Sequence, residues 1–485
     1  MSSFTLDLDS TRRAASPRYA PPPTPLRAVL IHGGVTVLWV LLFLRAFGTG
    51  GTFAWSIGLA YIGYDTALLL FVFAQTLPLR RPARPMGTAT GLQQNPVGLG
   101  VIVAAHNEAA VLPVSLAALF AQSTPPDEVV IADDGSDDGT ADLLTQTYGL
   151  ERPALGDMSA PGPHHPALRW LRLPHGGKAR ALNEALGRLS SEVVLTVDAD
   201  TVLDPEAVGA MRNAFAAEPD LVAATGVLFP VCSPTPVGRL FQWFQSYEYM
   251  RNFLSRYAWA RQDGLLLISG AFAAYRRSAV VAVGGFDTDC LVEDYELTHR
   301  LFHHAVAQGL RWRTDVIGGA RARTDAPGTL GAFLRQRRRW FGGFLQTQLW
   351  YRHMIGNRRY GRLGTRMLPV KAFDTMQPLY GLTSIALLIG YGLAGQYSVV
   401  GPVACVIGGK IGLDLLFYLW SLLLYRRWVG PSAQVNLGWA VVAALIEPFS
   451  FQVLRHGGAA LGWISFLTRQ RRWGLQERTG LIAPM

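Results

Sequence analysis

The sequence is poor in cysteine and lacks the residue spacings that bind zinc or nucleoside triphosphates. Its three cysteines, Cys232, Cys290 and Cys405, lie far apart in a chain of 485 residues. This distribution indicates neither a disulfide framework nor a zinc site. The spacing GxxxxGK[ST] is absent, which argues against a P-loop NTPase. The first residues show no cleavable signal pattern, so we expect no removed leader.

Charge is also scarce. Charged residues make up 16% of the chain, against about a quarter in an ordinary soluble domain. Half of the residues are hydrophobic and the mean hydropathy is +0.20, which predicts a membrane protein with a soluble part. The formal net charge is +10. Excess Lys and Arg in a membrane protein is typical of cytoplasmic loops and of contact with anionic headgroups, so we expect the lipid bilayer, and no nucleic acid, as a partner.

Apolar runs flank a long soluble stretch. Segments 28–47 and 53–77 each approach the roughly 20 residues that span a bilayer. Further runs cover 373–395, 398–425 and 435–454, and a shorter one at 457–467 leaves five or six crossings open. Arginines precede the first pair and LRRPARP follows it. The positive-inside rule then places the N-terminus and the soluble domain in the cytoplasm, at the inner (plasma) membrane.

These patterns predict six parts along the chain. They are a disordered cytosolic tail (1–26), two transmembrane helices (27–78), a cytoplasmic α/β domain (97–326), amphipathic interface helices (327–371), three or four transmembrane helices (372–468) and a basic tail (469–485). Segment 236–260 is a second amphipathic, aromatic-rich stretch. Both amphipathic regions suit helices at headgroup level, with ordinary core helices as the alternative.

Within the soluble domain, β-branched runs alternate with helical patterns, which predicts a mostly parallel sheet with helices on both faces. Polar side chains follow three of these runs. Asn107 and Glu108 come after GVIVAA, Asp134 after EVVIA, and Asp198 and Asp200 after EVVLTV. A single acid could be a helix N-cap. Three strands that all end in this way predict a ligand site, because ligands of open α/β sheets bind beyond the carboxyl ends of the strands.

Three motifs suggest what the ligand is. Asp198 and Asp200 suit one hard divalent cation that also binds phosphate oxygens. In the turn HGGK, which ends at Lys178, the glycines can direct backbone amides toward an anion and the lysine can add a positive charge. The alternative is that Lys178 is simply a solvated residue at the start of a helix. Asp294 follows at another helix start, where acids are electrostatically normal. The small residues of GGFD (284–287) before it would leave room for a bulky ligand.

The stretch FLRQRRRWFGG (333–343) concentrates positive charge beside an aromatic ring. It could be a topology signal at the membrane edge, a nucleic-acid patch, or a clamp for a phosphorylated molecule with a stacking platform. On a helix, Gln336, Arg339 and Trp340 share one face, because they stand at i, i+3 and i+4. Arg337 and Arg338 are then expected to point toward headgroups or solvent.

The motifs VIVAAHNE, ADDGSDDGT, GGKARALNEAL, TVDADT, VED and QRRRW, in this order, resemble the membrane-embedded family-2 glycosyltransferases. That group includes the cellulose, hyaluronan, chitin-oligosaccharide and poly-N-acetylglucosamine synthases. The resemblance covers roughly residues 97–345 and implies a GT-A fold for 97–326. VED stands where many relatives have TED, and FGG after the tryptophan is closest to the poly-N-acetylglucosamine synthases. UDP-GlcNAc is therefore one candidate donor, and the sugar stays open.

The resemblance also implies a role for each motif residue. Asp134 would hold the uridine, with Asn107 and Glu108 near the nucleotide; Lys178 would meet the diphosphate; Asp198 and Asp200 would bind Mg²⁺ or Mn²⁺ with that diphosphate; Asp294 would be the general base; and Gln336, Arg339 and Trp340 would hold the acceptor and the diphosphate.

The predicted function is inverting transfer of a sugar from a UDP-sugar to a growing polysaccharide with coupled export, for which an accessory membrane subunit would be a further partner. Two alternatives stay open: single addition to a lipid-linked or short acceptor, and a transporter or receptor with a degenerate nucleotide-sugar domain. Asp65, Lys410, Asp414 and Glu447 fall within apolar runs. Lys410 and Asp414 stand four residues apart and are expected to pair, either structurally or near a translocated polymer.

Overall fold

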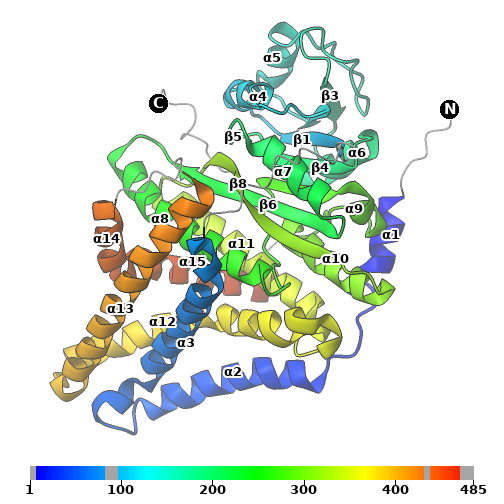
Figure 1. Cartoon of the computed structure of the whole chain (residues 1–485). Coiled ribbons are helices and arrows are strands. Elements are labelled where there is room, and N and C mark those ends of the chain that lie inside the picture. Colours follow the sequence, from blue (N-terminus) through cyan, green and yellow to red (C-terminus); the bar gives the residue numbers. More distant parts are fainter. Residues whose placement is uncertain (1–6, 82–96, 431–436, 470–485) are drawn as a thin grey trace.

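The structure is a computed structural model that describes residues 7–81, 97–430 and 437–469. An α/β domain lies on one side of the molecule and long helices from both ends of the chain lie on the other (Figure 1). Almost all of the predicted basic tail (469–485) falls outside the described residues.

A single eight-stranded sheet, in the order β3-β2-β1-β4-β7-β6-β8-β5, forms the centre of the α/β domain. The strands are β1 (Leu99–Ala105), β2 (Glu128–Asp134), β3 (Leu168–Leu173), β4 (Val193–Asp198), β5 (Thr201–Leu203), β6 (Leu221–Val231), β7 (Phe272–Arg276) and β8 (Arg313–Asp325). Strands β1 to β4 run parallel to one another, and their aliphatic residues are buried along nearly the whole length of each strand. Such continuous burial is typical of parallel strands covered on both faces.

Strand β7 runs antiparallel to both β4 and β6, and β5 runs antiparallel to β8. The sheet is therefore mixed, and the predicted α/β class is confirmed with antiparallel additions. The helices of this domain are α4 (Leu112–Phe120), α5 (Thr140–Gln146), α6 (Lys178–Arg188), α7 (Ala207–Ala217), α9 (Arg277–Ala282) and α10 (Glu293–Gln308). Helix α6 packs on β1 and β2, and α7 packs on β6 and β8.

Two long helices connect the sheet to the remaining helices. They are α8 (Pro236–Ala260) and α11 (Leu330–Trp350), and they coincide with the two aromatic-rich stretches predicted as helices. The chain then continues through α12 (Leu368–Leu393), α13 (Tyr397–Val429), α14 (Leu437–Ile446) and α15 (Phe451–Leu467), while α2 (Leu26–Arg45) and α3 (Ser56–Thr76) precede the sheet. Figure 1 shows α2, α3, α12 and α13 grouped on the side away from β3.

By length and composition, three of the described helical segments could cross a membrane: Leu26–Arg45, Gly51–Arg80 and Tyr397–Val429. The run predicted as a crossing over 435–454 is not one continuous helix, because it breaks at Glu447–Phe449 between α14 and α15, and its crossing of the membrane stays a prediction. Pro448 lacks an N–H for a continuing helix, and Glu447 forms an ion pair with Arg455 at 2.6 Å. The shorter run at 457–467 belongs to α15.

Glycines let α15 lie directly against α11. A Cβ atom on Gly462 would stand 2.7 Å from the Cβ of Phe341, and one on Gly458 would stand 2.6 Å from the Cβ of Arg337. On another side of α11, a Cβ on Gly343 would stand 2.5 Å from a methyl of Val292. These separations are too short for a larger residue, so Gly343 on α11 and Gly458 and Gly462 on α15 allow the close approach of α11 to its neighbours.

Over the described residues 7–26, the N-terminal segment is ordered, in contrast to the predicted disordered tail (1–26). Helix α1 (Leu8–Ala15) and the residues after it pack against α10 and the GGFD loop (284–287). Buried Arg12 donates to the carbonyl of Phe286 at 3.1 Å, and Arg18 lies 2.9 Å from the fully buried carboxylate of Asp287. Gly284 has a φ of +81°, and a Cβ there would meet the backbone of Arg12. The room expected near these glycines for a ligand is thus filled by the protein's own N-terminus.

We expect Arg18→Gln to lower the stability of the folded protein by about 3 kcal/mol, because it leaves the carboxylate of Asp287 buried without its ion-pair partner. Arg13→Gln is the matched control, since Arg13 is exposed on the same segment. Thermal unfolding in detergent measures the difference. Equal melting temperatures for the two variants would show that the ion pair contributes nothing to the docking of this segment.

The predicted pair of Lys410 and Asp414 is confirmed, and a third residue joins it. The Nζ atom of Lys410 on α13 forms ion pairs with Asp414 and, at 2.7 Å, with Asp65 on α3. The side chain of Lys410 is only 10% exposed. One cation therefore balances two carboxylates between two long apolar helices.

This arrangement predicts an asymmetric response to neutralisation. Lys410→Met leaves two carboxylates facing each other, and we expect it to cost about 3 kcal/mol of stability. Asp414→Asn leaves Lys410 paired with Asp65 and should cost less than about 1 kcal/mol. Unfolding of both variants in the same detergent checks this. A greater loss of stability for Asp414→Asn than for Lys410→Met would contradict the arrangement of Lys410 between Asp65 and Asp414.

Candidate active site

A cavity of about 1250 Å³ opens where the strand ends of the sheet face α8, α10 and α11. Every residue that the sequence assigned to the ligand site lines it: Asn107, Glu108, Asp134, Lys178, Asp198, Asp200, Asp294, Gln336, Arg339 and Trp340. The chain folds in this way because the strands β1, β2 and β4 lie side by side and end at the same edge.

The loops after β1 and β2 are tied to each other. Asn107 adopts a positive φ of 59°, and its Oδ1 accepts hydrogen bonds from the N–H groups of Asp137 and Asp138 at 2.9 and 3.3 Å. The backbone N–H of buried Glu108 donates to the hydroxyl of Thr140. Asn107 and Glu108 thus shape the loop that follows β2, next to the cavity.

Asp134 organises the turn that leads into α6. Its two carboxylate oxygens accept hydrogen bonds from the N–H groups of Gly176 and Gly177 at 2.7 and 2.8 Å. Gly177 has a φ of +91°, a conformation that favours glycine. The carboxylate at the end of β2 therefore holds the HGGK turn in place and directs Lys178 into the cavity.

Lys178 lies among carboxylates. Its Nζ atom is 2.5 Å from Asp198 and 3.5 Å from Glu293, and it donates to the carbonyl of Gly270. Burial alone would lower the pKa of Lys178, but the charges of Asp198 and Glu293 outweigh burial and raise the pKa above its usual range. Lys178 is therefore charged at neutral pH and connects β4 to the start of α10.

Among the acids at this edge of the sheet, Asp200 has the most strongly raised pKa. Burial, followed by the negative charges of Asp198 and Asp325, raises its pKa well above the usual range. A divalent cation would remove this repulsion, and carboxylate oxygens are the ligands that Mg²⁺ and Mn²⁺ accept. The donor set at Asp198 and Asp200 fits such an ion.

Asp294 stands at the start of α10 and faces the cavity. Its carboxylate accepts hydrogen bonds from the N–H groups of Gly270 at 2.6 Å and Tyr295 at 2.7 Å. Burial and the charge of Glu293 raise its pKa to about 6, against the opposing effects of the Gly270 N–H and Lys178. A carboxyl with this pKa is ionised at neutral pH and accepts a proton more readily than an ordinary aspartate.

Helix α11 supplies the opposite wall. Gln336, Arg339 and Trp340 line the cavity together, as their helical spacing predicts. Arg339 donates to the carbonyl of Leu291, in the loop that leads into α10 and Asp294. The side-chain oxygen of Gln336 is buried and has no hydrogen-bond partner among the described residues, so it is available to a hydroxyl of a ligand.

Arg337 differs from the prediction that it points toward headgroups or solvent. Its guanidinium donates two hydrogen bonds, of 2.8 and 2.9 Å, to the buried carboxylate of Glu248 on α8. It also lies 4.6 Å from the centroid of the Trp340 ring. The carboxylate on a distant helix makes this inward orientation favourable, and nothing in the local spacing of α11 indicates it.

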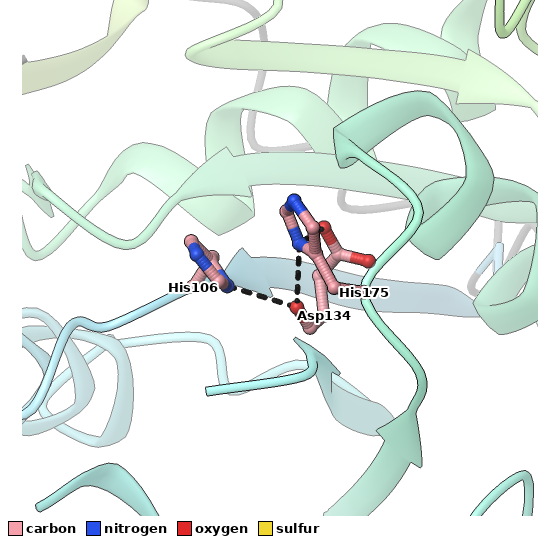
Figure 2. Close-up of side chains that lie close together, drawn as sticks. All are labelled: His106, Asp134 and His175. Carbon is pink, nitrogen blue, oxygen red and sulfur yellow. Dashed lines mark hydrogen bonds and ion pairs between the residues drawn. The ribbon is translucent and has the colours of Figure 1, made fainter. Parts of the chain in front are cut away.

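Two histidines lie beside Asp134 at the cavity. Figure 2 shows His106 and His175 both directed at this residue, with their Nδ1 atoms 2.9 and 3.1 Å from its carbonyl oxygen. The three side chains offer ligand atoms within 4.8 Å of one another. Since the Asp134 carboxylate already accepts two backbone N–H groups, the carboxylates of Asp198 and Asp200 fit a hard cation better.

Sequence reasoning missed three further cavity residues. Glu293 was passed over as an ordinary acid of a helix start, whereas it contacts Lys178. Glu248 and Arg256 were hidden in an aromatic-rich helix, with no motif around them. The available signal was the presence of charged residues among the aromatic residues of α8. A charged side chain on a buried helix needs a partner, so these residues could have been expected to face a polar site.

Curated relatives of this chain are synthases. Poly-beta-1,6-N-acetyl-D-glucosamine synthases of Staphylococcus epidermidis and of Staphylococcus aureus (strain COL) are 27% identical over 247 residues and 28% identical over 248 residues. Each similarity covers 51% of this chain and 54% of the relative. The chain thus spans about half the length of the curated relatives it matches.

A solved structure shares the fold. The mannosyltransferase from Pyrobaculum calidifontis, in complex with GDP-Man and Mn²⁺, superimposes with a TM-score of 0.52 and 21% identity, over 82% of this chain and 99% of the other. This likeness confirms the predicted GT-A fold class.

Two family models match the sequence. The model "Glycosyl transferase family 2" matches residues 100–284, and the model "Glycosyl transferase family group 2" matches residues 193–467, which is more than half of the chain. The shorter match includes the ends of β1, β2 and β4, and the longer one includes the end of β4, the start of α10 and the helices α11 to α15. The chain therefore belongs to glycosyl transferase family group 2.

Proposed function

We propose that this chain is an inverting glycosyltransferase that moves a sugar from a nucleotide-sugar donor to a carbohydrate acceptor. The observation that carries the proposal is the single cavity that contains the strand-end acids, a charged lysine, a carboxyl of raised pKa and the α11 face. A degenerate nucleotide-sugar domain in a transporter or receptor would not need all of these groups in one place.

Asp198 and Asp200 would hold Mg²⁺ or Mn²⁺, and Lys178 would add positive charge beside them. When bound, the cation would neutralise negative charge on the diphosphate leaving group. Asn107, Glu108 and Asp134 would border the nucleotide, since they shape the loops after β1 and β2.

Asp294 would take the proton from the attacking hydroxyl of the acceptor, on the face of the sugar opposite the leaving diphosphate. Its two backbone hydrogen bonds fix the carboxylate in the cavity wall. Trp340 would offer an aromatic face to the acceptor sugar, Gln336 a hydrogen-bond acceptor, and Arg339 a planar pair of donors for phosphate.

The synthase relatives support UDP-GlcNAc as the donor and a growing polysaccharide as the acceptor. A second cavity of about 330 Å³ supports coupled export across the bilayer. It shares Glu248, Asn252, Ser255, Arg337, Trp340 and Phe344 with the first cavity, and it also reaches Asp65 and Asp414 among the apolar helices. The catalytic domain would then face the cytoplasm at the plasma membrane, and an accessory membrane subunit would be a further partner.

Product analysis tests the proposal. Purified protein in nanodiscs is incubated with radiolabelled UDP-GlcNAc, other UDP-sugars or GDP-mannose, and the products are separated by size. We expect a long polymer with a UDP-sugar, loss of product in EDTA and recovery with Mg²⁺ or Mn²⁺, because Asp198 and Asp200 need the cation to hold the diphosphate. A single added sugar would favour the lipid-linked or short acceptor. Full activity after chelation would refute the metal assignment.

Asp294 gives a second, independent prediction. Because Asp294 must be deprotonated to act as a base and its pKa is about 6, kcat/KM should fall about tenfold per pH unit below pH 6 and level off above it. Asp294→Asn should lower turnover by at least about 10²-fold while UDP binding changes little. If the variant loses affinity for UDP as severely as turnover, Asp294 serves binding or folding and the assigned role is wrong.

A further inference from the structure

The arginines around the base of the cavity mostly have carboxylate partners. Arg337 pairs with Glu248, Arg455 lies 2.6 Å from Glu447, and Arg251 lies 4.0 Å from Glu447. Pairing of this kind is expected, since a buried guanidinium is costly unless an acid and hydrogen bonds compensate it.

Arg256, on the same helix as Glu248 and Arg251, is the exception. It lines the large cavity, yet its Nε and Nη1 atoms are buried and have no hydrogen-bond partner among the described residues. No ion pair of Arg256 is found within residues 7–81, 97–430 and 437–469. The described contact of its guanidinium is with the Phe253 ring, whose centroid lies 4.5 Å away.

This environment opposes the charge of Arg256. Burial lowers its pKa to about 10, and the charge of Asp294 offsets only part of that effect. The residue is still charged at neutral pH. A protein that needed only packing here would be more stable with an uncharged side chain.

We propose that Arg256 binds a phosphate oxygen of a ligand in this cavity. A guanidinium donates N–H groups in fixed directions to an oxyanion, and two of the donor nitrogens of Arg256, Nε and Nη1, have no partner among the described residues. Lys178 is already engaged by Asp198 and Glu293, whereas the charge of Arg256 forms no ion pair within the described residues.

Two ligands of the proposed function could carry this phosphate. One is the diphosphate of the nucleotide-sugar donor, and the other is the phosphate of a lipid-linked acceptor. The inference rests on the proposed function only for this choice, because binding of a phosphate group can be measured without any transfer reaction.

The experiment compares Arg256→Gln and Arg256→Lys with Arg239→Gln, whose arginine is exposed near the start of the same helix. The full chain in detergent is titrated with inorganic pyrophosphate plus Mg²⁺, and separately with dodecyl phosphate, by calorimetry. We expect Arg256→Gln to weaken binding of one probe about 10- to 100-fold, since hydrogen bonds to charged groups contribute this much. The affinity of Arg256→Lys should lie between that of the parent and that of Arg256→Gln, and the affinity of Arg239→Gln should equal that of the parent.

The two titrations distinguish between the two possible sources of the phosphate group. A loss confined to pyrophosphate assigns Arg256 to the donor, and a loss confined to dodecyl phosphate assigns it to the acceptor. Unchanged affinity of Arg256→Gln for both probes overturns the inference, as does an equal loss in Arg239→Gln. Arg256→Gln should also melt no lower than the parent without ligand, so a marked destabilisation with unchanged binding would show a structural role.

These outcomes are independent of the proposed function. If no nucleotide-sugar gives product but probe binding depends on Arg256, the phosphate site stands and the transferase proposal fails. If transfer occurs and both probes bind the Arg256 variants normally, the transferase proposal stands and the Arg256 site fails.

Discussion

The buried ion pair between Arg337 and Glu248 joins the two helices that wall the cavity. It is bidentate, and the two side chains are 11% and 5% exposed. Loss of Glu248 would leave the charge of Arg337 uncompensated, at a cost of about 3–5 kcal/mol, whereas loss of Arg337 would leave Glu248 with a longer ion pair to Arg455, at 3.8 Å. Because Arg337 also lies over Trp340, the pair sets the position of that ring in the cavity wall. The spacing of α8 and α11, and with it the boundary between the two cavities, depends on this contact.

Much of the candidate site was predictable because its residues follow strands. A parallel sheet brings the ends of β1, β2 and β4 to one edge whatever the loops do, so Asn107, Asp134 and Asp198 had to lie near one another. The helical spacing of Gln336, Arg339 and Trp340 likewise determines a shared face before any packing is known. In both cases, the pattern of residues along the chain is sufficient to predict which side chains lie together.

Contacts between distant segments were not predictable in this way. Arg337 was expected to face outward, and only the packing of α8 against α11 places Glu248 opposite it. The break at Glu447 was likewise missed, because hydropathy averages over Pro448 and over a carboxylate whose partner, Arg455, lies on the next helix. The antiparallel strand β7 depends on pairing with β4 and β6, which the order of motifs does not contain.

The docking of the N-terminal segment has a consequence for the order of events during synthesis. Arg18 and its partner Asp287 are 269 residues apart in the chain. A ribosome therefore completes two apolar helices and nearly the whole sheet before the partner of Arg18 exists. Until then residues 7–19 have nothing to dock on, and their ordering is one of the last steps of assembly. Residues 7–19 can thus pack on the loop that leads to Asp294 only after that loop has been made.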